Sequence, residues 1–274
     1  MNMTEYTEKM TQLFLNKNWC NPASKNSLKE IILLGENIDS DSRAMLYELT
    51  VKFEKITWND YLNRLFDSLN LINFDDAFFS NINNIYLLPI LKDSDKDKAK
   101  SPQSTTYAFS DEDLECHPFF QKFNILRESE RNTIKSIKND NNYRIMLIDD
   151  FIGTGGTAIK YLDEISSKYQ TIKDNIFFIF IAGMEEGINF LTSKGYKVYC
   201  GYIQAKGISD IQEAEKKDKY IELMNKLEKK FSIIDKFHFG YGHSEALIKM
   251  IRTPNNTFPI YWDKKKNKHA PFKR

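Results

Sequence analysis

Hydrophobic residues recur at helical spacing through residues 1–80, with polar residues between them. The longest set on one helix face is Trp58, Tyr61, Leu62, Leu65, Phe66 and Leu69. Thr57 followed by Asp60 resembles a capping box at the start of this helix. The pattern predicts a helical N-terminal region over residues 1–80, in which the apolar stripes form the core.

The pattern changes at Ile85. Four apolar runs follow without polar alternation, over residues 85–88, 145–148, 176–182 and 197–203. Helical periodicity separates the second run from the third and the third from the fourth. Buried strands that alternate with helices predict a parallel sheet with helices on both faces. The expected fold class is therefore α/β, with the helical region over 1–80 followed by an α/β domain over 81–274.

Composition excludes several classes of protein. The chain has 274 residues, with 39 Lys and Arg against 38 Asp and Glu, and a net charge of +1 disfavours nucleic-acid binding by bulk charge. No run approaches the length of about 18 apolar residues that a membrane-spanning helix needs, and the polar N-terminus lacks the pattern of a secretory leader. Three scattered cysteines predict neither a disulfide framework nor a zinc site. We therefore expect a cytoplasmic protein without membrane association.

The candidate chemistry lies after the second apolar run. Asp149 and Asp150 follow this run directly, and a short loop then leads into a helical pattern; the loop residues are Gly153, Thr154, Gly155, Gly156 and Thr157. Amides of a glycine-rich loop and of a helix N-terminus bind anions. Carboxylates at the carboxyl end of a strand can hold sugar hydroxyls directly or through a divalent ion. Together these features predict a site for a phosphorylated sugar.

Other motifs fit this segment less well. A P-loop is excluded, because Ala158 stands where its second glycine belongs and no Lys-Ser/Thr pair follows. The relaxed dinucleotide pattern Gly-x-Gly-x-x-Ala is met, but four residues separate the apolar run from Gly153. A tight turn with a capping Asp explains the glycines but not two carboxylates beside two threonines. The dinucleotide and turn interpretations stay open as alternatives.

The run from Ile145 to Thr157 resembles the signature of type I phosphoribosyltransferases that binds phosphoribosyl pyrophosphate (PRPP). That signature has four apolar residues, two acids, two apolar residues, a variable position and Thr-Gly-x-Thr, and these 13 residues meet every position. The resemblance implies that Asp149 and Asp150 are catalytic, approaching the ribose hydroxyls and holding Mg²⁺ directly or indirectly. It implies that residues 153–157 bind the 5′-phosphate, with Mg²⁺ as the cofactor and no organic cofactor.

Segments outside the motif resemble the phosphoribosyltransferase-like domains of bacterial conflict and anti-phage systems, including retron-linked effectors. These segments are the helical N-terminal region with Trp58 and Tyr61, the strand end at Pro89, residues 239–242, the tail over 253–262 and the terminal residues 270–274. The resemblance implies a glycosyl-transferring effector that uses PRPP or a related ribosyl phosphate in defence. A non-catalytic nucleotide sensor, a protein partner docked on the 1–80 helices and a homodimer remain open.

Two features depart from familiar members of the superfamily. Gly153 stands where purine-salvage enzymes often carry an Asp that handles the base proton, which disfavours nucleobase salvage of that kind. The loop after Pro89 has no glycine and contains four lysines. If this loop binds pyrophosphate, we expect Lys100 and Ser101 to contact it; a solvated run of charges is the alternative interpretation.

Weaker candidates lie near the C-terminus. Asn255, Asn256 and Trp262 occupy a proline-bounded segment that can form an acceptor pocket through amide hydrogen bonds and ring stacking. A turn built by Asn and Pro for local reasons explains the same residues. His238 and His243 are candidate general bases, although no base can be assigned from the sequence.

Overall fold

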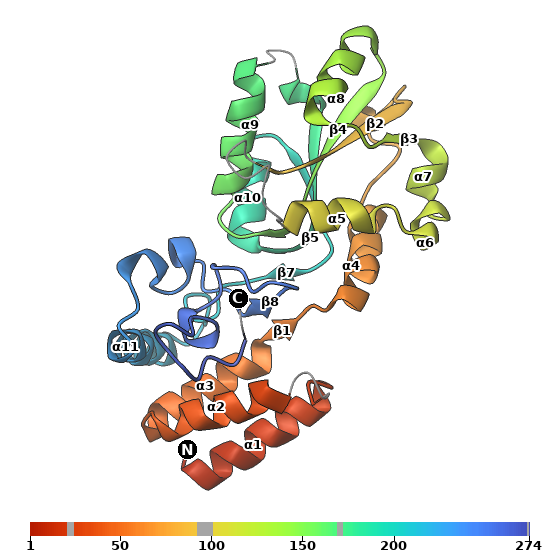
Figure 1. Ribbon diagram of the computed structural model, residues 1–274. Coiled ribbons are helices and arrows are strands. Elements are labelled where there is room, and N and C mark those ends of the chain that lie inside the picture. The colour runs from red at the N-terminus through yellow and green to blue at the C-terminus, as the bar shows by residue number, and fades with distance from the viewer. Residues whose placement is uncertain (21–24, 92–100, 169–171, 273) are drawn as a thin grey trace. The chain divides into compact units, whose positions relative to one another are not determined.

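The computed structural model describes residues 1–20, 25–91, 101–168, 172–272 and 274 (Figure 1). Contacts divide the chain into two compact units. Unit 1 comprises Met1–Ile56 and Ala205–Arg274, and unit 2 comprises Thr57–Gln204. The first of these divisions falls at Thr57, within the region over 1–80 that the hydrophobic pattern predicts as one helical segment.

Unit 2 is built around a parallel sheet. Its strands are β2 (Asn84–Pro89), β3 (Asn124–Leu126), β4 (Tyr143–Ile152), β5 (Ile176–Met184), β6 (Lys197–Cys200) and β7 (Ile203–Gln204). The strand order is β3-β2-β4-β5-β6, β7 pairs with the end of β5, and each of these pairings is parallel. β5 is buried along its whole length, as expected for a strand covered on both faces.

The helices of unit 2 precede or connect the strands. They are α4 (Trp58–Asn70), α5 (Ser101–Ala108), α6 (Glu112–Glu115), α7 (Pro118–Lys122), α8 (Glu130–Ser136), α9 (Gly156–Lys168) and α10 (Glu185–Ser193). Short 3-10 turns lie at η1 (Ala77–Phe79), η3 (Ile137–Asn139) and η4 (Lys173–Asn175).

Helices cover both faces of this sheet. Ile145 and Leu147 of β4 pack in one apolar cluster with residues of α9 and α10. Met146 and Ile148, which alternate with them, pack in a second cluster with Leu65 of α4 and with residues of α6 and α7. The prediction of an α/β fold with a helix-covered parallel sheet is confirmed.

The sequence pattern predicts the start and the buried face of helix α4, but not the surface on which that face packs. Its start is capped as expected, since the backbone N–H of Thr57 donates to Asp60 Oδ2 at 2.7 Å. Its apolar face contacts β5 and β6, and Ser68 donates a hydrogen bond to the carbonyl of Phe180 in β5. α4 therefore belongs to the sheet of unit 2.

Unit 1 joins the two ends of the chain. It contains α1 (Met3–Asn16), α2 (Lys25–Glu36), α3 (Ser40–Lys52) and α11 (Ala214–Lys230), and β1 (Glu54–Lys55) pairs in parallel with β8 (Ile248–Lys249). Short turns η5 (Asp235–Phe237), η6 (Tyr241–His243) and η7 (Pro259–Tyr261) follow α11.

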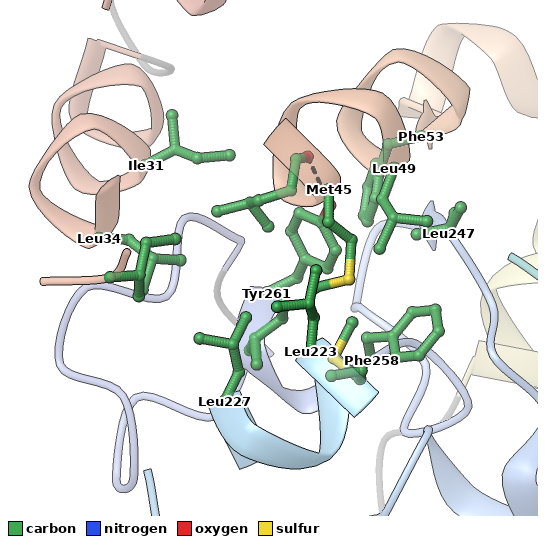
Figure 2. Packing of buried hydrophobic residues seen from close by; sticks show 14 of the residues in the cluster. Ile31, Leu34, Met45, Leu49, Phe53, Leu223, Leu227, Leu247, Phe258 and Tyr261 are labelled. Carbon is green, nitrogen blue, oxygen red and sulfur yellow. Dashed lines mark hydrogen bonds between the residues drawn. The ribbon is translucent and has the colours of Figure 1, made fainter. Parts of the chain in front are cut away.

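The core of unit 1 draws on both parts of its chain. Figure 2 shows side chains of α2, α3 and α11 packing against residues of the segment that follows α11, here called the C-terminal segment. The labelled residues are Ile31, Leu34, Met45, Leu49, Phe53, Leu223, Leu227, Leu247, Phe258 and Tyr261. The rings of Phe53 and Tyr261 lie 4.8 Å apart, and the hydroxyls of Thr50 and Tyr261 are hydrogen-bonded at 3.0 Å. The C-terminal segment thus completes a core that the N-terminal helices begin. Across the described ranges, no helix has the length and apolar character needed to cross a membrane.

Candidate functional site

Strand β4 carries both candidate carboxylates to the carboxyl edge of the sheet. β4 is flanked by β2 and β5, and it continues in register with β5 as far as Ile152, which pairs with Gly183. The apolar run in the sequence ended at Ile148, so the expected strand end was four residues too early. Gly153 follows the strand directly, so its spacing from the strand no longer disfavours a dinucleotide-binding turn. The other residues of the site must therefore indicate which ligand the loop binds.

The two carboxylates have different surroundings. Asp150 is 5% exposed, and the hydroxyl of Tyr61 in α4 donates a hydrogen bond to its Oδ2 at 2.9 Å. Asp149 is only partly buried, and its Oδ1 accepts the backbone N–H of Asp150 at 2.8 Å. Because successive side chains of a strand leave opposite faces, one carboxylate is held toward α4 while the other leaves the opposite face of the sheet.

The loop after β4 leads straight into helix α9. Gly155 has a φ of +79°, a conformation that glycine adopts without steric cost, and α9 begins at the next residue. The backbone N–H of Ile159 donates to the carbonyl of Gly155, which makes this carbonyl part of the first helical turn. The first amides of a helix have no partner within it and carry a partial positive charge. The loop therefore has the form of an anion-binding turn, with Thr154 and Thr157 at least partly accessible.

Helix α10 packs against this loop at very short range. A Cβ atom placed on Gly187 of α10 would lie 2.1 Å from the carbonyl oxygen of Gly153, and one placed on Gly155 would lie 2.8 Å from the ring of Phe190. These glycines let the helix and the loop approach closely. Sequence reasoning did not find Gly187; the available signal was a glycine within the predicted helix after the third apolar run.

Tyr61 is the second residue that sequence reasoning missed as part of the site. Its helical spacing predicted a core position, and it is indeed buried, but its hydroxyl reaches Asp150. Helical periodicity reports which face of α4 is buried and cannot identify the group at the tip of a buried side chain.

Of the two residues predicted to contact pyrophosphate, only Ser101 lies within the described residues. Lys100 lies outside the described residues, and Ser101 is the first residue of α5. The assignment of this pair to pyrophosphate stays a prediction.

The predicted acceptor residues belong to unit 1, whereas the motif belongs to unit 2. Asn256 donates to the carbonyl of Tyr241 and to Ser244 Oγ, and the indole N–H of Trp262 donates to the carbonyl of Thr257 at 2.7 Å. Asn255 contributes its backbone carbonyl, which accepts the N–H of Tyr241. These contacts stabilise the C-terminal segment, and a role in binding an acceptor remains a prediction.

The two candidate bases also lie in unit 1. His238 Nδ1 is 3.8 Å from a carboxylate oxygen of Glu228, while His243 is exposed. Neither histidine has a contact among the described residues that identifies it as a base.

A family model matches most of the chain. The model of the family described as PRTase-CE, in which PRTase stands for phosphoribosyltransferase, matches residues 13–274. No curated protein and no solved structure matches the chain. The match extends over both units and includes the whole strand, loop and helix of the candidate site. The chain belongs to the PRTase-CE family and is phosphoribosyltransferase-like.

Proposed function

We propose that this protein binds PRPP, or a closely related phosphorylated ribose, at the carboxyl edge of β4. One observation carries the proposal: two carboxylates at the end of a central parallel strand are followed at once by a glycine and threonine loop and a helix N-terminus. The loop amides suit a 5′-phosphate, and the carboxylates suit ribose hydroxyls. Phosphate and hydroxyls of one ribose phosphate would be held together.

Each carboxylate has a distinct part in this proposal. Asp150 is held by Tyr61, so its carboxylate is fixed before a ligand arrives. Asp149 is more accessible and is the better candidate for contact with a ligand-borne cation. Fixed groups of this kind contribute to catalysis by positioning the sugar rather than by attacking it.

The donor set fits Mg²⁺ carried by the ligand. Among the residues that the structure describes, no group of three or more His, Cys, Asp or Glu side chains is placed to hold a metal ion. Mg²⁺ commonly binds one or two carboxylates together with substrate phosphates, and Asp149 with Asp150 can supply that carboxylate part. When bound, Mg²⁺ neutralises charge on the phosphates.

We propose glycosyl transfer as the reaction. The bond between ribose C1 and the pyrophosphate oxygen breaks, pyrophosphate leaves with the electron pair, and an acceptor atom forms the new bond to C1 while losing its proton to solvent. The loop residues hold the 5′-phosphate, and the carboxylates hold the hydroxyls, so that C1 is presented in one orientation. Negative charge beside the ribose stabilises the positive charge that develops there.

The biological setting that we propose is bacterial defence, with this protein as an effector. The support is the resemblance of the helix carrying Trp58 and Tyr61, of residues 239–242 and of the C-terminal tail to conflict-system domains. A second candidate function is that of a non-catalytic subunit of such a system, which senses a nucleotide or binds a protein partner. Gly153 favours this candidate because the position lacks the acid that handles the base proton in purine-salvage enzymes.

Calorimetric titration with PRPP and Mg²⁺ tests the proposal. We expect saturable binding by the wild type and none by the Asp149→Asn/Asp150→Asn double variant. Asp163→Asn, which makes the same chemical change at an exposed position of α9, is the matched control and is expected to bind normally. Equal binding by the double variant would refute the proposed site. Pyrophosphate release in the presence of candidate acceptors would favour the enzyme over the sensor.

A further inference from the structure

Positive charge is distributed unevenly along the chain. Residues 249–274, here called the basic segment, contain eight Lys and Arg residues and one Asp, a net charge of +7. Residues 1–248 contain 31 Lys and Arg residues against 37 Asp and Glu residues. The whole basic segment belongs to unit 1. A balanced total disfavours binding through bulk charge, but it does not disfavour binding at a local basic surface.

Most cations of the basic segment have no carboxylate partner. Six of these side chains are exposed: Arg252, Lys264, Lys265, Lys266, Lys268 and Arg274. Of these six, and within the described parts of the chain, Lys264 alone has a carboxylate at ion-pair distance, that of Glu30 at 3.6 Å. A block of like charges without compensating acids is typical of a segment that interacts with an oppositely charged partner.

The fold holds these like charges close together. Tyr261 and Phe272 anchor the basic segment in the core of unit 1, and the side chain of Asn267 donates to the carbonyl of Ile260 at 2.8 Å. Arg274 is exposed as a residue, but desolvation by neighbouring atoms, followed by the positive charge of Arg252, lowers the pKa of its guanidinium. Repulsion of this kind destabilises a folded protein, and a bound polyanion would remove that cost.

A row of aromatic rings adjoins the basic segment within unit 1. The guanidinium of Arg274 lies over the ring of Trp262, 5.2 Å from its centroid. The Trp262 ring is 5.4 Å from that of Phe237, which is 6.5 Å from that of Tyr241. Lys236 Nζ lies over Phe237 at 5.8 Å and over Tyr241 at 5.7 Å. Cations therefore lie at both ends of the row, and Tyr241, at 39% exposed, is its most accessible ring among those with a stated exposure.

The combination of cations and rings favours one class of polyanion. Proteins that bind single-stranded nucleic acid use cations for the phosphates and aromatic rings for the bases. A duplex is read by a helix or a two-stranded ribbon in its major groove, whereas the basic segment contributes β8 and the turn η7. A lipid surface needs apolar side chains that can insert; those of the segment are buried, with Ile251 as the large exception at 46% exposed.

We propose that the basic segment and the adjoining row of rings form a surface of unit 1 that binds single-stranded nucleic acid. The exposed lysines neutralise phosphates, and Tyr241 stacks on a base. Asp235 and Asp263 also lie beside this surface, where the six exposed cations of the segment outnumber them. Contacts to phosphates and ring faces carry little sequence information, so we expect weak sequence preference. The proposal does not depend on PRPP binding, and its failure would leave the proposed function intact.

Fluorescence anisotropy of the full chain with labelled oligonucleotides tests the proposal. The probes are oligodeoxyuridylate and oligouridylate of about 20 nucleotides, which exceed a typical site size of about 4–16 nucleotides. We expect saturable binding that weakens steeply as salt rises from about 50 to 200 mM. The two probes differ only in the 2′-hydroxyl, so their relative affinities distinguish DNA from RNA as the bound strand. Failure of both probes to bind at low salt would overturn the proposal.

A triple variant locates the contribution of charge. Lys265→Gln/Lys266→Gln/Lys268→Gln should bind more weakly. The slope of log association constant against log salt should fall in magnitude by about two, since each phosphate contact to a single strand contributes about 0.7. The matched control is Lys135→Gln/Lys138→Gln/Lys173→Gln, which removes the same charge from exposed positions of unit 2. We expect this control to bind like the wild type, and equal weakening in both variants would overturn the proposal.

Variants of Tyr241 test the stacking contact. Tyr241→Ala should weaken binding about tenfold, which is within the range found when a stacking ring is removed, whereas Tyr241→Phe retains the ring and should bind normally. Both variants should unfold at the same temperature as the wild type, because the replaced side chain is partly exposed. Equal affinities of these two variants would overturn the stacking role. Tighter binding to a duplex of the same length, or to phosphatidylserine-containing vesicles, than to either single strand would overturn the choice of ligand.

Discussion

Replacing Gly187 by alanine provides a sharp test of how the candidate phosphate loop is held. Gly187 lies in the first turn of α10, and its added Cβ would lie 2.1 Å from the carbonyl oxygen of Gly153 and 2.9 Å from Cγ1 of Ile152. The nearest obstacle is a backbone atom, which cannot rotate away as the end of a side chain can. The loop, the helix or both must therefore move.

The size of the movement follows from the contact. Cβ atoms essentially never approach another heavy atom within 3.0 Å, so the gap of 2.1 Å must widen by about 0.9 Å. Overpacking of this kind costs about 1–3 kcal/mol of folding free energy. A displacement of about 1 Å in a binding group can cost on the order of 100-fold in function. We therefore expect Gly187→Ala to unfold at lower temperature and to lose PRPP affinity by about 10- to 100-fold.

Gly195→Ala is the matched control. Gly195 has a φ of +89°, and no atom lies within 4 Å of an added Cβ, so alanine there introduces backbone strain without a collision. This strain costs about 1–2 kcal/mol, which is similar to the expected cost at Gly187. Thermal unfolding and PRPP calorimetry of both variants separate the two effects. If Gly187→Ala is folded and binds PRPP as tightly as Gly195→Ala does, the argument that α10 positions the loop is refuted.

Three further predictions concern single buried side chains. Tyr61→Phe removes the hydrogen bond to buried Asp150 and should lower the free energy of unfolding by about 1–3 kcal/mol in a denaturant titration; an unchanged midpoint would show that the bond contributes nothing. In unit 1, burial raises the pKa of the Glu228 carboxyl to about 7, so the folded protein keeps a proton that the unfolded chain releases above pH 4.5. Stability should therefore fall by about 3 kcal/mol as pH rises from 4.5 past 7. Glu228→Gln should flatten this dependence, and parallel pH curves of the two proteins would contradict it. Phe53→Ala should cost about 3–5 kcal/mol in a urea titration, because the ring is fully buried in the core of unit 1; a cost below about 1 kcal/mol would mean that the core repacks.

The strand, loop and helix of the candidate site could be predicted because their signals are local. An apolar run, a glycine cluster and a helical period follow one another within about 25 residues. The end of the strand was misplaced for a physical reason. Asp149 and Asp150 continue the extended backbone of β4 at the carboxyl edge of the sheet. Because both residues are polar, the hydrophobic pattern ends before them although the strand does not.

The placement of α4 shows a different limit. Its apolar stripe correctly predicted a helix with one buried face, but periodicity does not reveal which surface covers that face. The position of α4 in the sequence suggests that its apolar face packs on the preceding helices, whereas it packs on β5 and β6. The C-terminal segment poses the same difficulty in unit 1, since Tyr261 packs on Phe53 across more than 200 residues of intervening chain.

The same distinction explains what the signature can and cannot encode. The residues proposed to hold the ribose phosphate lie within one stretch, 149–157, so one short pattern captures them. The residues that fix their positions come from elsewhere: Tyr61 lies 89 positions before Asp150, and Gly187 comes from the helix after the next strand. A chain that retained the signature but lost Tyr61 and Gly187 would no longer hold Asp150 and the loop in these positions. Variants of Tyr61 and Gly187 therefore test the proposed site without altering any residue of the motif.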